Sequence, residues 1–80
     1  MKKINWGIIG LGNIANQFAE GFSNLDNAFI KGIASKNEKK LISFKNKFNI
    51  VDNFCFNKYE ELISNPDIDI IYIALPNSLH

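Results

Sequence analysis

The positions of hydrophobic residues alternate between strand-like and helix-like patterns along the chain. Residues 3–9 are almost continuously apolar, which predicts a strand buried on both faces, because a strand with one exposed face would alternate. From residue 13 the spacing becomes that of an amphipathic helix with a small-residue edge, which favours close contact with a sheet. The residues that define this helix are Ile14, Phe18 and Phe22, with Ala15 and Ala19 beside them.

The same alternation continues downstream. Residues 28–34 are predicted to form a second strand. Residues 38–48 carry apolar side chains at helical spacing among lysines, which predicts a second helix with Asn37 as its N-cap; these side chains are Leu41, Phe44 and Phe48. The remaining predicted elements are a short strand within residues 52–56, a helix that opens on a capping box of Asn57 and Glu60 and runs through Ile63, and a strand over residues 68–75.

This order of elements predicts an α/β fold of Rossmann type with an incomplete doubly wound parallel sheet. Right-handed crossovers between parallel strands give the strand order 3-2-1-4. Ligands of such sheets bind beyond the carboxyl ends of the strands, near the point where the order reverses. Three predicted loops meet there, and they form the candidate site: residues 10–13, 35–37 and 75–80.

The first of these loops carries a glycine pattern. Gly10, Gly12 and Ala15 match the Gly-x-Gly-x-x-Gly/Ala fingerprint of dinucleotide-binding folds. A turn that merely needs glycine is the alternative explanation, but the preceding strand and the following helix favour a nucleotide site. The amides of Asn13 and Ile14, at the start of the helix, would then donate to a pyrophosphate.

The second loop bears on the choice of cofactor. Sites that prefer NAD usually place an acidic residue there, on the ribose hydroxyls, whereas this chain has Ser35 and Lys36. A hydroxyl and a cation suit the 2′-phosphate of NADP. The alternative is that Lys36 is simply one more solvated lysine, so the sequence favours NADP and leaves NAD open.

Composition narrows the function classes. The chain has 80 residues, enough for one small domain, and its net charge of +1 gives no basic surface for nucleic acid or for a membrane. Its longest apolar run, residues 70–75, is far shorter than the roughly 20 residues that span a bilayer. Cys55 is the only cysteine, which excludes an intrachain disulfide and favours a cytoplasmic location.

Three stretches of the sequence together are similar to one known family. Residues 6–15, 33–36 and 69–80 resemble the amino-terminal domain of the glucose-fructose oxidoreductase/inositol dehydrogenase family (Gfo/Idh/MocA), and the similarity runs over essentially the whole chain. The Trp-Gly start and the Leu-Pro-Asn-Ser-Leu-His end look most like the xylose and dihydrodiol dehydrogenase branch, which tends to use NADP.

The resemblance implies an NAD(P)-binding segment and places its contacts. Lys36 stands where many relatives have arginine, which keeps the charge but loses the planar fork. The expected cofactor contacts fall in the three loops: Gly10, Gly12, Asn13, Ile14 and Ala15 at the pyrophosphate; Ser35 and Lys36 at the adenosine ribose or its phosphate; and Leu75, Pro76, Asn77 and His80 beside the dinucleotide.

The resemblance also implies what residues 1–80 lack. Family members continue into a strand ending in Glu-Lys-Pro, whose lysine serves catalysis, and then into an α/β domain that holds the substrate, a sugar or polyol. We therefore expect no catalytic or metal-ligating residues within this chain and no dehydrogenase activity from it alone. A non-enzymatic nucleotide-binding module and a remnant without function are the alternatives, and the uncovered sheet face predicts self-association or a protein partner.

Overall fold

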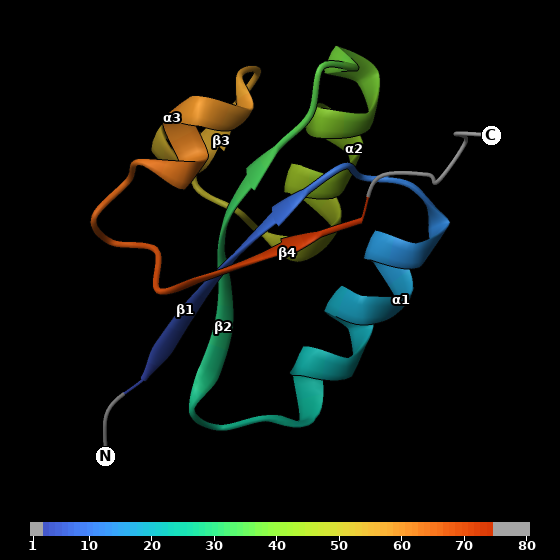
Figure 1. The fold of residues 1–80 in the computed structure, drawn as a ribbon. Coiled ribbons are helices and arrows are strands. Elements are labelled where there is room, and N and C mark those ends of the chain that lie inside the picture. Colours follow the sequence, from blue (N-terminus) through green and yellow to red (C-terminus); the bar gives the residue numbers. More distant parts are fainter. Residues whose placement is uncertain (1–2, 75–80) are drawn as a thin grey trace, which may run out of the picture.

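The computed structural model describes residues 3–74, apart from the side chain of Ser23, as a four-stranded parallel sheet with helices against it (Figure 1). There are also two short 3-10 segments. One, η1 (Gly21–Asn24), follows the first helix, and the other, η2 (Asp52–Phe54), precedes the third strand. The strands are β1 (Ile4–Ile9), β2 (Ala28–Ala34), β3 (Cys55–Phe56) and β4 (Ile70–Ile73), and the α-helices are α1 (Asn13–Glu20), α2 (Glu38–Phe48) and α3 (Tyr59–Ile63).

The strands lie in the order β3-β2-β1-β4, which confirms the topology predicted from right-handed crossovers. β1 is central and pairs in parallel with β2 on one side and with β4 on the other. Its register with β2 shifts by one residue between Trp6 and Gly7. The reversal of strand order therefore falls at the carboxyl end of β1, where the glycine turn begins.

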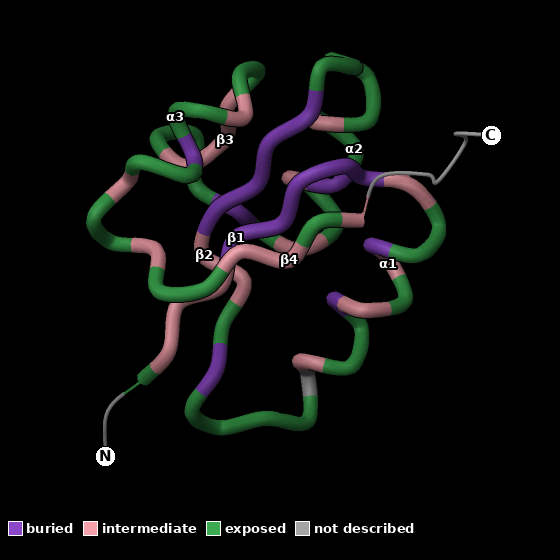
Figure 2. Tube along the Cα trace, in the orientation of Figure 1, coloured by how far each residue is buried: buried purple, intermediate pink, exposed green. Residues whose placement is uncertain are grey.

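Two hydrophobic layers cover the sheet. Ile8 and Ile33 point to the layer formed by α1 and α2, whereas Ile9 and Ala34 point to the layer that contains Leu62 of α3. Neighbouring residues of one strand thus contact opposite layers, as the alternation of strand side chains requires. The carboxyl halves of β1 and β2 are buried in both layers (Figure 2), which fixes the backbone immediately beneath the candidate site.

Two strand glycines bring α3 close to the sheet. A Cβ atom added to Gly32 would lie 2.8 Å from Leu62 Cδ1, and one added to Gly7 would lie 3.2 Å from the same atom. Leu62 itself is fully buried. These glycines therefore leave the space that Leu62 fills, and they serve packing rather than a turn.

The buried face of α1 is narrower than the sequence pattern predicts. Ala15 and Ala19 are its buried residues, whereas Ile14 is 58% exposed. Phe18 flanks this face and stacks on Tyr72 of β4, with 3.9 Å between the ring centroids. The small residues let the helix approach the sheet closely, so the larger side chains move to its edges.

Other differences concern the ends of elements. The capping box expected at Asn57 and Glu60 is wrong, because α3 begins at Tyr59 with Lys58 as its N-cap residue and without a side-chain cap. Asn57 consequently lies one residue too early to cap the helix. β4 begins at Ile70 rather than at residue 68. The Ile68 N–H donates to the Asn65 carbonyl within the preceding turn, whereas the Asp69 N–H donates to the carbonyl of Asn5 in β1, so contact with β1 starts one residue before the strand. Residue 75, the expected end of this strand, lies outside the described residues.

Candidate functional site

A cavity of about 490 Å³ opens at the carboxyl ends of β1, β2 and β4. It lies at the reversal of strand order, where open α/β sheets bind their ligands. Two of the three predicted loops, residues 10–13 and 35–37, contribute to its wall. The lining residues are Gly10, Leu11, Gly12, Asn13, Ile14, Ser35, Lys36, Asn37, Lys40, Tyr59 and Ala74.

The glycine turn forms one wall of this cavity. Gly10 has a φ of 84°, a conformation in which an L-residue with a side chain is strained by about 1–2 kcal/mol. Its N–H donates to the Ala34 carbonyl over 3.1 Å, so the turn is tied to the end of β2. Gly12 has an ordinary φ of −90°, and a Cβ atom added to it would meet nothing within 4 Å.

The amino terminus of α1 is open to the cavity. Gly12 is its N-cap residue, and no side chain caps this helix end. The first amides of a helix have no partner within the helix, and those of Asn13 and Ile14 belong to residues that line the cavity. Together with the helix dipole, they form a surface that attracts an anion. Ala15 is instead fully buried beneath the helix and supports it from the sheet side.

The loop after β2 is held by its own hydrogen bonds. Ser35 is buried, its N–H donates to the Phe56 carbonyl over 3.1 Å, and its Oγ accepts from the Asn37 N–H over 3.1 Å. Asn37 caps α2 as predicted, because its Oδ1 accepts from the Lys40 N–H over 3.1 Å. The Ser35 hydroxyl proton can still donate to a ligand, since only an acceptor position of the oxygen is used.

Two lysines and an aromatic ring complete the opposite wall. The Lys36 ammonium lies 5.2 Å from the centroid of the Tyr59 ring, a distance at which a cation is attracted to the ring face. Lys40 lines the same cavity from the first turn of α2. Both lysines are exposed, so their charges face solvent at the mouth of the cavity and favour an anionic ligand.

The sequence did not point to Lys40 or Tyr59. Lys40 carries a signal that was missed, because it stands one helical turn after the loop at residues 35–37 and therefore faces the same side. Tyr59 carries no comparable signal. It reaches the cavity because α3 packs across β1, β2 and β3, and that placement follows from the tertiary fold.

The third predicted loop cannot be compared with the structure. Leu75, Pro76, Asn77 and His80 lie outside the described residues, and their predicted cofactor contacts stay predictions. Ala74 is the last described residue and lines the cavity, with its N–H donating to the Ile9 carbonyl over 2.8 Å. The chain therefore leaves β4 at the edge of the site.

Apart from this cavity, a cluster of titratable side chains lies at the end of α2 and around β3. Lys45 and Asp52 form an ion pair over 2.8 Å, and this hydrogen bond and charge raise the pKa of Lys45. Cys55 is half-buried, and its Sγ donates to the Val51 carbonyl over 3.4 Å. Burial raises the pKa of the Cys55 thiol, which keeps this thiol protonated and unreactive.

Within residues 3–74 no group of three or more histidine, cysteine, aspartate or glutamate side chains could hold a metal ion. The helices of this part of the chain are also too short or too polar for any of them to cross a membrane.

Comparisons with known proteins agree with this geometry. A model of an oxidoreductase family with an NAD-binding Rossmann fold (GFO_IDH_MocA) matches residues 4–80. Oxidoreductase P35 of Formosa agariphila is 39% identical over 79 residues, which is 98% of this chain and 24% of that protein. The trans-1,2-dihydrobenzene-1,2-diol dehydrogenase of Mus musculus is 32% identical, over 96% of this chain and 23% of that protein.

The fold also matches solved structures. A 3-ketoreductase from Actinomadura kijaniata, whose structure contains TDP-benzene and NADP, superposes with a TM-score of 0.82 at 26% identity, over 99% of this chain and 24% of that protein. The chain thus spans about a quarter of the length of the curated relatives it matches.

Proposed function

The chain belongs to the Gfo/Idh/MocA oxidoreductase family and forms its NAD-binding Rossmann unit, and from this membership we propose that the cavity at the glycine turn binds a nicotinamide dinucleotide. The amides of Asn13 and Ile14 would hold the pyrophosphate, and the loop at residues 35–37 would hold the adenosine ribose. The residues fit this ligand, because uncapped helix amides and two cations face the cavity.

The conformation of Gly12 carries this proposal. No steric contact in the described chain requires glycine there, because its φ is −90° and an added Cβ would meet no atom within 4 Å. The N-cap position favours glycine over alanine only modestly. Gly7 and Gly32, in contrast, face Leu62 at short distances. Glycine at a position where no protein atom needs the space is explained by a ligand that approaches the backbone closely.

We further propose that the cofactor is NADP. Ser35 offers a hydroxyl donor, and Lys36 and Lys40 place two positive charges on the wall formed by the loop after β2 and the first turn of α2. A 2′-phosphate would find charge-assisted partners there, whereas the ribose of NAD would lack the usual carboxylate.

The whole protein would transfer a hydride between the cofactor and a sugar or polyol, as the family resemblance implies. We propose that the substrate site and the catalytic lysine lie outside these 80 residues, since the chain spans only about a quarter of the length of its curated relatives. We also propose a cytoplasmic location, because the one cysteine of these 80 residues is a half-buried free thiol.

Titration of the natural gene product with NADPH and NADH, followed by nicotinamide fluorescence, tests the proposal. We expect saturable binding that is tighter for NADPH. Lys40→Met and Lys36→Met should each weaken NADPH binding about tenfold, because each removes a charge-assisted contact, and should leave NADH binding unchanged.

Lys39→Met is the matched control. Lys39 is equally charged and adjacent to Lys40, yet it does not line the cavity, so its loss should leave both affinities unchanged. Absence of saturable binding by either nucleotide would contradict the cofactor site. Equal losses for NADPH and NADH would contradict the role of the lysines at the 2′-phosphate.

A further inference from the structure

We propose that Asn16 and Lys47 orient the Gly12–Asn13 peptide and so position the amide that binds the pyrophosphate. This inference rests on the proposed cofactor site and adds two positioning residues to it. Neither residue lines the dinucleotide cavity. Asn16 lies one turn into α1, and Lys47 lies in the last turn of α2, so the two helices meet at this contact.

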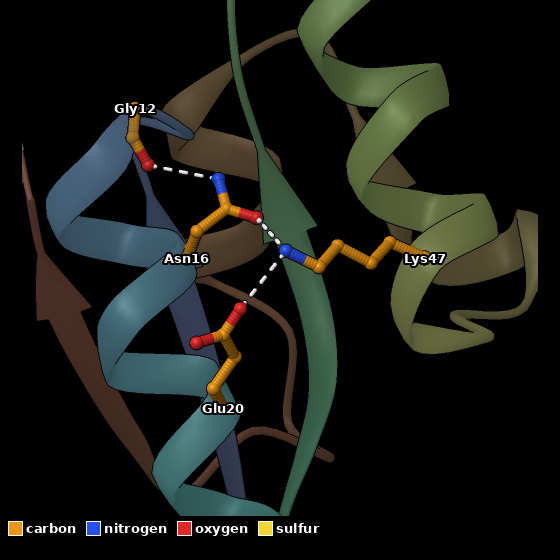
Figure 3. A network of polar contacts seen from close by, with 4 residues as sticks. All are labelled: Gly12, Asn16, Glu20 and Lys47. Carbon is orange, nitrogen blue, oxygen red and sulfur yellow. Dashed lines mark hydrogen bonds and ion pairs between the residues drawn. The ribbon is translucent and has the colours of Figure 1, made fainter.

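A continuous set of hydrogen bonds joins Lys47 to the glycine turn (Figure 3). The Lys47 ammonium donates to Asn16 Oδ1 over 3.2 Å, and Asn16 Nδ2 donates to the Gly12 carbonyl over 3.0 Å. The same carbonyl accepts from the Asn16 backbone N–H over 3.1 Å. Two donors from one residue therefore fix the direction of this carbonyl.

The direction of the carbonyl determines that of the neighbouring amide. The Gly12 carbonyl and the Asn13 N–H belong to one planar trans peptide and point in opposite directions. Since the carbonyl points into α1, the Asn13 N–H points out of the helix end. A Cβ atom added to Gly12 would meet no atom within 4 Å, so packing does not restrain this peptide on that side. The side-chain bond from Asn16 therefore adds a restraint to the ordinary helical bond.

Lys47 determines which end of the Asn16 amide faces the turn. An ammonium group can only donate, so its contact selects the oxygen of the Asn16 amide and leaves the NH₂ group for the Gly12 carbonyl. Lys47 also forms an ion pair with Glu20 over 3.0 Å. The two side chains of that pair are 49% and 58% exposed, and such exposed pairs contribute little stability, so the pair alone does not explain the arrangement.

The affinity of the natural gene product for NADPH tests this role in matched variants. Asn16→Ala should raise the Kd about tenfold, because it removes one hydrogen bond that orients the binding amide. The variant should fold, since alanine is the best helix former. Lys47→Met should raise the Kd about threefold, and Lys47→Arg, which also only donates, should restore the affinity.

The double variant distinguishes the positioning role of Lys47 from a role in which Lys47 only holds α1 and α2 together. If Lys47 acts through Asn16, Asn16→Ala combined with Lys47→Met should bind no more weakly than Asn16→Ala alone. Glu20→Gln removes the ion pair but keeps an oxygen near Lys47, and it should leave the Kd unchanged. Lys39→Met removes an equal charge from the same helix and should also leave the Kd unchanged.

The outcomes distinguish this inference from the function on which it rests. Normal NADPH binding by Asn16→Ala, or losses that add in the double variant, would overturn the positioning role and leave the cofactor site intact. A loss of NADPH affinity in Glu20→Gln as large as that in Lys47→Met would also overturn it, and would indicate that Lys47 only holds the two helices together. Failure of the unaltered protein to bind NADPH or NADH would overturn both proposals.

Discussion

Single glycines in this chain answer two different physical demands. Gly7 and Gly32 make room inside the protein for Leu62 and its neighbours, whereas Gly12 leaves room outside it. The sequence pattern marked Gly12 through its spacing from Gly10, but it gave no reason for Gly7 or Gly32. Their role depends on which side chain of α3 crosses the sheet, and local sequence does not determine that contact.

Replacement of Gly32 by alanine should destabilise the fold by about 1–3 kcal/mol, because the new methyl group would overlap fully buried Leu62. Gly21→Ala is the control, since an added Cβ there meets nothing within 4 Å and the residue is helical. That change should be neutral or stabilising by about 0.5 kcal/mol. Chemical denaturation of both variants measures the difference, and equal stabilities would contradict the packing role.

Gly12→Ala, in contrast to Gly32→Ala, should affect cofactor binding more than stability. The free energy of unfolding should fall by no more than about 1 kcal/mol, because no atom lies near the new methyl group and the only loss is that of glycine as the N-cap residue. Cofactor affinity should fall at least about tenfold, because the methyl group would keep the pyrophosphate from the backbone. Parallel measurements of unfolding and NADPH binding test this. A variant that unfolds more easily but binds normally would show that Gly12 serves the fold.

At the scale of elements, helix and strand patterns predicted α2 and β2 to the residue, because each has strong periodicity and a clear boundary. Prediction failed where a boundary depends on tertiary contacts. Lys58 rather than Asn57 precedes α3, and Ile14 lies outside the core although it continues an apolar stripe. Ala15 and Ala19 take the buried positions, since only small residues let α1 approach the sheet.

The contacts around the end of α2 predict that the folded state loses stability at alkaline pH. Burial raises the pKa of Cys55, and the hydrogen bond with Asp52 raises that of Lys45. A group whose pKa is higher in the folded state stabilises that state fully below its unfolded pKa and loses the effect as the pH rises through the folded pKa. Stability should therefore begin to fall above about pH 8.5, the ordinary pKa of a thiol, and fall further as Lys45 deprotonates.

Thermal unfolding midpoints between about pH 7 and pH 10.5 measure this loss, over the range in which thiols and lysines titrate. Cys55→Ala removes the thiol, so the earlier part of the decline should disappear and the later part should remain. A midpoint that stays constant or rises across this range would contradict the assignment of both groups.

At the scale of the whole molecule, the topology was predictable because right-handed crossovers leave few arrangements of parallel strands. The convergence of residues 10–13 and 35–37 on one cavity followed from that topology. The contribution of Lys40 and Tyr59 did not, since it depends on how α2 and α3 are placed on the sheet. The hydrogen bonds from Lys47 through Asn16 to Gly12 join residues 35 positions apart in sequence. They could not be predicted from the sequence either, because they depend on the contact between α1 and α2.

The open edge of the sheet predicts self-association of a polypeptide limited to residues 1–80. Among the described residues β4 pairs with β1 alone, and Ile73 on this edge strand is 63% exposed. Exposed apolar edge strands pair with other chains. Sedimentation at about 50 μM, within the range in which such edges associate, should show oligomers.

Ile73→Lys should reduce this association, because a charged side chain on an edge opposes pairing. Ile42→Lys is the control, since Ile42 is 52% exposed on α2 and away from the edge, and it should leave the association unchanged. A monomeric 80-residue polypeptide, or equal effects of the two lysines, would contradict this role of β4.

A crystal structure of the natural gene product with NADPH tests the central claim most directly. We predict that the pyrophosphate lies within hydrogen-bonding distance of the Asn13 and Ile14 amides, against Gly12, and that the 2′-phosphate lies between Ser35 and the two lysines at positions 36 and 40. A pyrophosphate bound away from the amino end of α1, with the cavity at the glycine turn left without nucleotide, would contradict it.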